Sequence, residues 1–135
     1  MRIFKTKWLA RFARRGRITD QSLGEAITRA ERGLVDADLG GGLIKQRVAR
    51  SGQGQSGGYR MLVAFRAQGR AVFLYGFAKN EREDIDPDEL VSLREIAAAW
   101  LAADAEQIAQ AIESDELQEV SYDQDGAQPV DAGDS

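Results

Sequence analysis

The sequence predicts an α+β domain in which an N-terminal helical hairpin packs on a small antiparallel sheet, with further helices after the sheet. Three observations predict this order of elements: helical spacing of apolar residues over 6–34, strand-like runs over 43–79, and helix-start signals at Asp86 and Asp104. With 135 residues, 43% of them hydrophobic, the chain can bury an ordinary core. We therefore expect one domain with a tail.

The N-terminal part is predicted to hold a short edge strand, Arg2–Phe4, and two helices. In the first helix, over residues 6–15, Trp8 and Phe12 lie four residues apart and share a face. The second helix covers about residues 20–33, where apolar residues recur at helical spacing: Leu23, Ala26, Ile27, Ala30 and Leu34. The apolar stripe of this hairpin needs a cover, and the sheet that follows is the expected partner.

Three strand-like runs follow a flexible turn at residues 36–42, and together they predict a three-stranded antiparallel meander. The runs cover residues 43–49, 59–66 and 71–79. The last run is apolar almost throughout, so it is expected to be central and covered on both faces. The N-terminal edge strand is expected to extend this sheet.

The strand period of two predicts which side chains of these runs share a face. It puts Lys45 and Arg47 on one face, with Ile44 and Val48 on the other. In the second run it puts Arg60 with Leu62, whereas another set shares the opposite face: Tyr59, Met61, Val63 and Phe65.

The C-terminal part is predicted to contain two helices, which begin at Asp86 and Asp104, and one short strand after Ser114. From these patterns we expect a main domain over residues 1–101 and a helical extension over 102–120. Residues 121–135 are expected to form an acidic, disordered tail.

Charge is divided sharply along the chain. Residues 1–82 hold 17 Lys and Arg against 6 Asp and Glu, whereas residues 83–135 hold 1 against 16, and together they give the net charge of −4. A sheet that carries many fixed cations is typical of a surface that binds a polyanion, and nucleic acid is the commonest one in cells. The low overall pI therefore does not exclude nucleic acid as a partner.

Composition excludes several kinds of site. The chain has no cysteine and no histidine, so disulfides, thiolate chemistry, Ser-His triads and imidazole metal sites are excluded. The carboxylates of residues 83–89 are interpreted as helix-capping groups and not as a metal cluster. No apolar run approaches the roughly 20 residues that span a bilayer, and no signal peptide is recognisable. We expect a soluble, cytoplasmic protein without metal or cofactor.

The runs LIKQRVA, GQSGGYRMLVAFR and VFLYGFAKNEREDI, all between Leu43 and Ile85, resemble the RelE/ParE superfamily of type II toxin–antitoxin toxins, and its RelE-like branch most. The similarity covers roughly residues 1–101. It implies ribosome-associated mRNA cleavage that inhibits translation, and neutralisation by a cognate antitoxin encoded nearby. It also implies attack by a ribose 2′-hydroxyl with Lys, Arg and sometimes Tyr in place of histidines, so the expected partners are an antitoxin, mRNA and the ribosome.

The candidate catalytic residues are Arg60, Lys45, Arg47 and Lys79, and the candidate RNA-binding residues are Arg50, Tyr59, Tyr75 and Arg82. Arg60 matches the arginine of the family's GYR motif, and its planar guanidinium suits a phosphate. If Lys45 acts as the base, its pKa has to fall well below the usual value of about 10.4. Asn80 stands where RelE proper has an arginine, and the tyrosine that some members place a few residues later is missing. The acid and the base therefore stay open.

Two other functions stay open at this stage. A ParE-like toxin would inhibit DNA gyrase without catalysis, and a toxin-fold protein without activity would keep only antitoxin or nucleic-acid binding. The acidic tail is interpreted as a solubilising segment, with folding back over the cationic sheet as the alternative.

Overall fold

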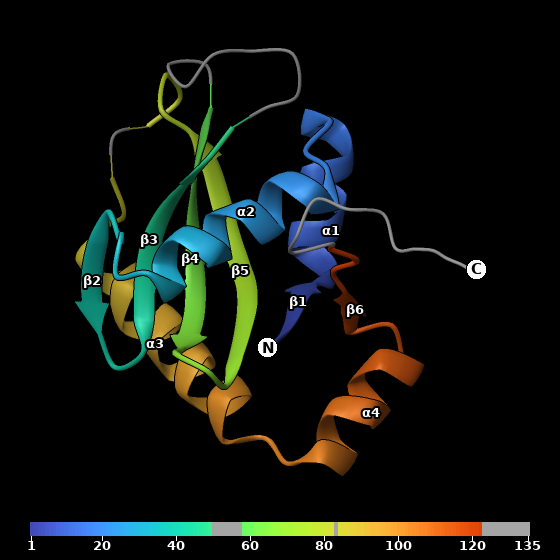
Figure 1. The fold of residues 1–135 in the computed structure, drawn as a ribbon. Coiled ribbons are helices and arrows are strands. Elements are labelled where there is room, and N and C mark those ends of the chain that lie inside the picture. The colour runs from blue at the N-terminus through green and yellow to red at the C-terminus, as the bar shows by residue number, and fades with distance from the viewer. Residues whose placement is uncertain (50–57, 83, 123–135) are drawn as a thin grey trace.

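A computed structural model describes residues 1–49, 58–82 and 84–122, which form one six-stranded sheet with helices on both faces (Figure 1). The strand order is β2-β3-β4-β5-β1-β6. The strands are β1 (Arg2–Thr6), β2 (Ala37–Gly40), β3 (Leu43–Val48), β4 (Tyr59–Arg66), β5 (Arg70–Ala78) and β6 (Leu117–Glu119). The helices are α1 (Lys7–Gly16), α2 (Asp20–Glu31), α3 (Pro87–Ala102) and α4 (Ala105–Glu113).

The sheet separates two hydrophobic cores, because successive strand side chains point to opposite faces. On one face α1 and α2 cover a core that includes Leu9, Leu23 and Phe73. On the other face α3 and α4 cover a second core, with Leu62 and Ile108 among its members. In Figure 1, α2 crosses in front of the sheet and α3 lies behind it.

The predicted α+β class and the central meander are confirmed. β3, β4 and β5 pair in antiparallel order, and β5 is covered on both faces, with Phe73 in one core and Val72 in the other. α3 and α4 begin after Asp86 and Asp104 as predicted. Both N-terminal helices pack on the same face, whereas their mutual packing as a hairpin stays a prediction.

The two ends of the sheet differ from the prediction. β1 is not an edge strand: it lies between β5, to which it is parallel, and β6, to which it is antiparallel. At the other end, residues 37–40 form the edge strand β2 and not a flexible turn. Three glycines with positive φ, Gly40, Gly41 and Gly42, let the chain reverse into β3. For β1 the difference comes from hydrogen bonds to β5 and β6, which are distant in the sequence and which local composition does not encode. β2 instead pairs with β3, the next strand in the chain.

The C-terminal extension joins the same sheet. β6 pairs with β1, and the backbone N–H of Val120 donates to Ile3 O at 2.8 Å. A domain boundary near residue 101 stays a prediction, and the tail from residue 123 lies outside the described residues. Within the described residues, no helix combines the length and the apolar character needed to cross a membrane.

Candidate nucleic-acid interface

Side chains on the second face of the sheet differ in accessibility between its two ends. Near the C-terminus of α3, the sheet residues Leu43, Ala64 and Val72 are fully buried. Toward the opposite end, side chains on the same face become accessible: Lys45, Arg60 and Tyr75 are half-buried and Arg47 is exposed. This end holds four of the eight residues that the sequence analysis proposed for the site. We call it the open end of the sheet.

Two arginines lie directly opposite each other at the open end. The strand register pairs Arg47 of β3 with Arg60 of β4, and it pairs Lys45 with Leu62 two residues further along. Like charges directly opposite in a sheet are destabilising, so this arrangement costs stability unless an anion offsets it. Three predicted site residues are thereby brought together on one face.

Protein carboxylates offset only part of this charge. Arg47 Nε lies 3.7 Å from Asp36 Oδ2, and the same oxygen accepts the backbone N–H of Arg47 at 2.6 Å. Within the described residues, Arg60 takes part in no ion pair. Unlike the charge of Arg47, the charge of Arg60 is therefore not offset by an ion pair within the described residues.

Lys45 has an acidic neighbour from the turn before α3. Lys45 Nζ and Asp84 Oδ1 lie 3.3 Å apart, and the Asp84 side chain is 67% exposed. A hydrogen bond from the backbone N–H of Ile85, together with the Lys45 ammonium, lowers the pKa of Asp84. Asp84 therefore stays ionised at neutral pH, and its carboxylate partly offsets the charge of Lys45.

Arg82 is held by the protein instead of being free. Its Nη2 donates to Glu89 Oε1 at 2.6 Å, its Nη1 lies 3.4 Å from the hydroxyl of Tyr75, and its guanidinium lies 5.6 Å from the ring centroid of Phe77. The hydrogen bond with Glu89 raises the pKa of Arg82 and lowers that of Glu89. Glu89 also accepts the N–H of Asp86 at the start of α3, in agreement with the predicted capping role of these carboxylates.

The remaining residues that the sequence analysis proposed for the site do not lie with Lys45, Arg47 and Arg60. Tyr59 is 9% exposed and packs edge-to-face on Phe12 on the opposite face, so the structure separates it from Arg60. Lys79 is exposed just beyond the paired part of β5. Arg50 lies outside the described residues.

The sequence analysis did not propose Trp8 as a site residue, although Trp8 borders the open end. Its ring stacks on Tyr75 at 4.6 Å and on Phe12 at 5.3 Å, and the residue is 43% exposed. The sequence signal was an aromatic residue at the start of a basic helix. Its contact with β5 came from the tertiary fold.

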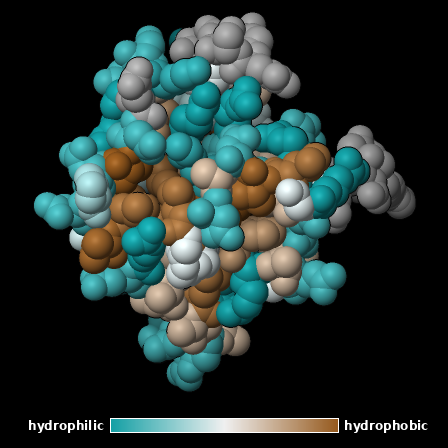
Figure 2. All heavy atoms as spheres, turned by 90° about the vertical axis from the view of Figure 1, so that its left-hand side faces the viewer, coloured by the Kyte–Doolittle hydropathy of each residue, from teal (hydrophilic) through white to brown (hydrophobic). Residues whose placement is uncertain are grey.

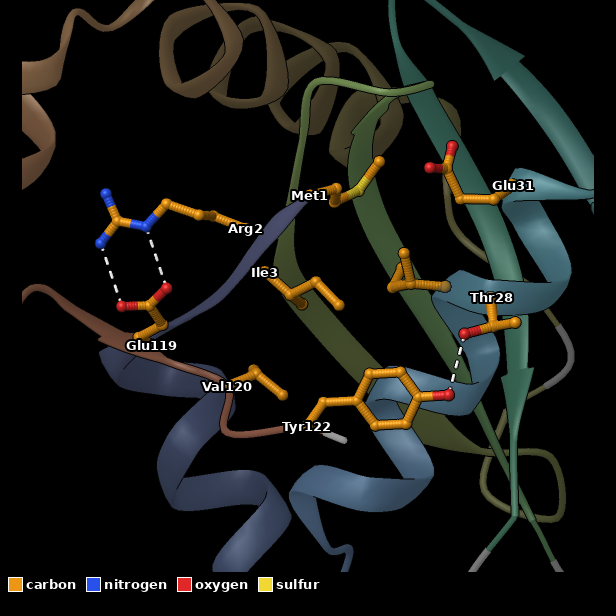
Figure 3. A pocket seen from close by; sticks show the side chains of 9 residues that line it. Met1, Arg2, Ile3, Thr28, Glu31, Glu119, Val120 and Tyr122 are labelled. Atoms are coloured by element: carbon orange, nitrogen blue, oxygen red, sulfur yellow. Dashed lines mark hydrogen bonds and ion pairs between the residues drawn. The ribbon is translucent and has the colours of Figure 1, made fainter. Parts of the chain in front are cut away.

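A separate pocket of about 210 Å³ lies between β1, α2 and the C-terminal segment (Figure 3). Its polar groups are paired with one another: Arg2 Nε donates to Glu119 Oε2 at 2.9 Å, and the hydroxyls of Thr28 and Tyr122 lie 2.9 Å apart. Because these groups already have partners, we do not place the functional site there. No group of three metal-ligating side chains occurs within residues 1–49, 58–82 and 84–122.

Comparison with known families supports the resemblance. A family model described as the RelE toxin of the RelE/RelB toxin–antitoxin system matches residues 1–120. The chain belongs to the RelE toxin family. No curated protein matches it individually.

Membership of the RelE family implies a cognate antitoxin as partner. This RelE-family chain exposes apolar side chains on part of its surface. Apolar residues spread over the side of the molecule that carries β2 (Figure 2). Large apolar side chains are exposed on and near that side of the chain's fold, namely Leu34 before β2 and, on α3, Val91 at 53% and Ile96 at 44%.

Proposed function

We propose that this RelE-family chain is a toxin that cleaves mRNA on the ribosome and thereby inhibits translation. The observation that carries the proposal is the opposed pair Arg47–Arg60 at the open end, with Lys45 two residues away on the same face. Such a pair is unfavourable by itself and becomes favourable when a phosphodiester binds between the two guanidinium groups.

The proposed reaction is transesterification within the RNA. The 2′-oxygen attacks the adjacent phosphorus, the bond from phosphorus to the 5′-oxygen breaks, and a 2′,3′-cyclic phosphate and a 5′-hydroxyl form. One proton leaves the 2′-hydroxyl and one reaches the departing 5′-oxygen, so the net reaction needs no co-reactant. Negative charge gathers on the non-bridging oxygens in the transition state, and fixed cations stabilise it there.

The geometry supports a division of roles. Arg60, which has no ion pair within the described residues, binds the non-bridging oxygens, and Arg47 opposite it completes the clamp. Lys45, two residues from Arg47 on the same face, adds a third cation, and its ammonium group is proposed to donate a proton to the leaving oxygen. Arg82 is a positioning residue, because its bonds to Glu89 and Tyr75 fix the wall of the site.

The test is controlled expression of the full chain, followed by mapping of new 5′ ends on cellular mRNA. We expect codon-phased cuts that disappear with Arg60→Ala. The matched control is Arg32→Ala, which removes one exposed cation at the end of α2, on the other side of the sheet. Growth arrest with intact mRNA and DNA-damage signalling would instead identify a gyrase inhibitor. Intact mRNA without growth arrest would identify an inactive toxin fold.

We also propose that the antitoxin docks against the outer surface of α3. This surface exposes Val91 and Ile96, and residues 84–122 hold a single basic residue, Arg94, among many carboxylates. The complementary segment is apolar with basic flanks. Val91→Asp should weaken toxin–antitoxin association in a pull-down of co-expressed proteins without changing mRNA cleavage, whereas Val91→Ala should have little effect. Equal association of all three proteins would exclude this surface.

A further inference from the structure

A second set of aromatic and basic side chains lies on α1, beside the open end. Trp8 and Phe12 lie four residues apart, as do Arg11 and Arg15, and this spacing places all four on one side of the helix. The opposite side is the buried one and holds Leu9, Ala10 and Ala13. We call the first set the α1 stripe.

The α1 stripe is continuous with the open end through stacked rings. Phe12 stacks on Trp8, Trp8 stacks on Tyr75, and Tyr75 lies 6.4 Å from Phe77 between ring centroids. Phe77 is the residue that pairs with Arg60 across β4 and β5. The rings therefore lead from the candidate phosphate clamp over the edge of β5 onto α1.

The helix dipole accounts for only some of the charges of α1. Arg14 and Arg15 occupy the last turn, where cations interact favourably with the helix dipole. Lys7 stands at the first position, where a cation is unfavourable, and the first turn has no acidic residue. In the parts of the chain that the structure describes, neither Arg11 nor Arg15 forms an ion pair.

A hollow of about 380 Å³ borders the stripe, between α1 and the ends of β4 and β5. Phe12 and Arg15 line it from the helix, and Ala78 and Asn80 line it from the strand side together with Glu81. Gly76 lets the helix approach the strand, since a Cβ there would lie 2.9 Å from the ring of Phe12. Tyr59, on the face opposite Arg60, also lines the hollow. The close approach of α1 thus places an aromatic and cationic wall at the same end of the sheet as the clamp, on the other face.

We propose that the α1 stripe binds the same single-stranded RNA as the clamp: an unpaired base packs on Trp8, and Arg11 and Arg15 bind flanking phosphates. Aromatic rings interleaved with cations are the usual means of holding single strands, because every base has a π-face and every linkage a charge. The inference rests on the proposed function only for the identity of the RNA as mRNA.

The first test measures binding without cleavage. The probe is a mixed-sequence, single-stranded oligonucleotide with 2′-O-methyl riboses, which cannot undergo attack by a 2′-oxygen. In Trp100→Phe the only tryptophan is Trp8, and we expect the oligonucleotide to change its fluorescence. Trp8→Leu should weaken binding roughly 5- to 100-fold, because leucine keeps the apolar cover but has no π-face, and Trp8→Phe should restore most of the affinity.

The second test measures salt dependence. Log affinity falls as log salt rises, and the double variant Arg11→Ala and Arg15→Ala should reduce the magnitude of this slope by about 1.4. Each phosphate contact to a single strand contributes about 0.7 to that magnitude. Arg32→Ala is the matched control and should leave the slope unchanged. Purified ribosomes as a second probe separate the sources of RNA: an effect on ribosome binding but none on the oligonucleotide would assign the stripe to ribosomal RNA and overturn the single-strand proposal.

The outcomes of the two proposals are distinguishable. If mRNA is cleaved in cells but Trp8→Leu binds the oligonucleotide normally while keeping its thermal unfolding midpoint, the stripe is excluded and the nuclease proposal remains. If no cleavage occurs but Trp8→Leu and the arginine variant weaken RNA binding, the stripe is supported and the nuclease proposal fails. Loss of antitoxin binding with normal RNA binding would reassign the stripe to a protein contact.

Discussion

Each end of the second sheet face carries two arginines that lie opposite each other on neighbouring strands, but the surroundings of the two pairs differ. At the open end Arg47 lies opposite Arg60, and at the other end of the same face Arg66 lies opposite Arg70. The second pair is stabilised within the protein: Arg70 Nη1 donates to Trp100 O at 2.7 Å and Ala103 O at 2.8 Å, and Arg66 Nη1 donates to Leu101 O at 2.8 Å. These carbonyls belong to the C-terminal end of α3, where the helix dipole favours cations.

The difference between the ends follows from the position of α3. The helix starts beside Arg82 and runs over the sheet to end at Ala102, so its electronegative end meets Arg66 and Arg70. Its N-terminal end lies on the side of the open end and offers no carbonyls to Arg47 and Arg60. The same residue type is therefore structural where the helix ends and available for a ligand where the helix begins.

The largest effect that tests this comparison is on activity at the open end. Arg60→Ala should reduce mRNA cleavage about 100- to 1,000-fold, the usual cost of removing one group that stabilises transition-state charge. Its free energy of unfolding should stay equal to that of the unchanged chain or rise, because one opposed charge is removed. Cleavage of mRNA in a reconstituted translation reaction and urea unfolding check the two statements. If Arg60→Ala keeps full activity or is strongly destabilised, Arg60 is not the ligand-binding counterpart of the structural pair Arg66–Arg70.

The next effect is on stability at the covered end. Arg70→Ala removes two hydrogen bonds from a charged donor and should lower the free energy of unfolding by about 2 kcal/mol. Burial, with Arg66 and Arg2 nearby, lowers the pKa of Arg70, which nonetheless stays charged at neutral pH. Urea unfolding measures the loss, and Arg32→Ala is the control. RNA cleavage measured well below the unfolding midpoint should be unchanged, and its loss would show that Arg70 is more than structural.

A smaller effect concerns the carboxylate at the open end. Asp84→Asn removes the negative charge 3.3 Å from Lys45 and should tighten binding of the 2′-O-methyl oligonucleotide about two- to fivefold at low salt, as expected for an exposed ion pair. The gain should vanish at high salt through screening. Asp88→Asn, which removes an exposed charge in the first turn of α3, is the comparison variant. Weaker binding after Asp84→Asn would mean that Asp84 orients Lys45 instead of competing for it.

The smallest effect is on the pH dependence of stability. The pKa of Glu89 is lowered by its hydrogen bond with Arg82, so this bond contributes stability above the ordinary glutamate pKa of about 4.3 and loses it as pH falls through the lower folded value. Between pH 5 and pH 3, the free energy of unfolding should therefore fall less steeply with decreasing pH in Glu89→Gln than in the unchanged chain. The bonds of Arg66 and Arg70 to carbonyls should add no pH dependence, because carbonyls do not titrate. Equal slopes for both proteins would show that the Arg82–Glu89 bond contributes nothing measurable.

Much of the open end was predictable because strand periodicity is a local property. The spacing of two placed Lys45 with Arg47 and Arg60 with Leu62, and it already placed Tyr59 on the other face. The helix starts at Asp86 and Asp104 were predictable for the same reason, since capping uses neighbouring backbone groups. The RNA-binding role given to Tyr59 rested on the ability of a tyrosine ring to stack on a base, and the structure packs this ring on Phe12 on the opposite face.

The sequence by itself determined the alternation of faces, the helix starts and the cationic character of the strands, because each depends on residues within one or two turns or strand steps. Only the tertiary structure decided which arginines are available. Arg82 meets Glu89, Arg70 meets the last carbonyls of α3, and Trp8 meets Tyr75, through contacts that depend on how α1 and α3 lie on the sheet. Helix placement depends on the packing of the whole core, and no short stretch of residues specifies it.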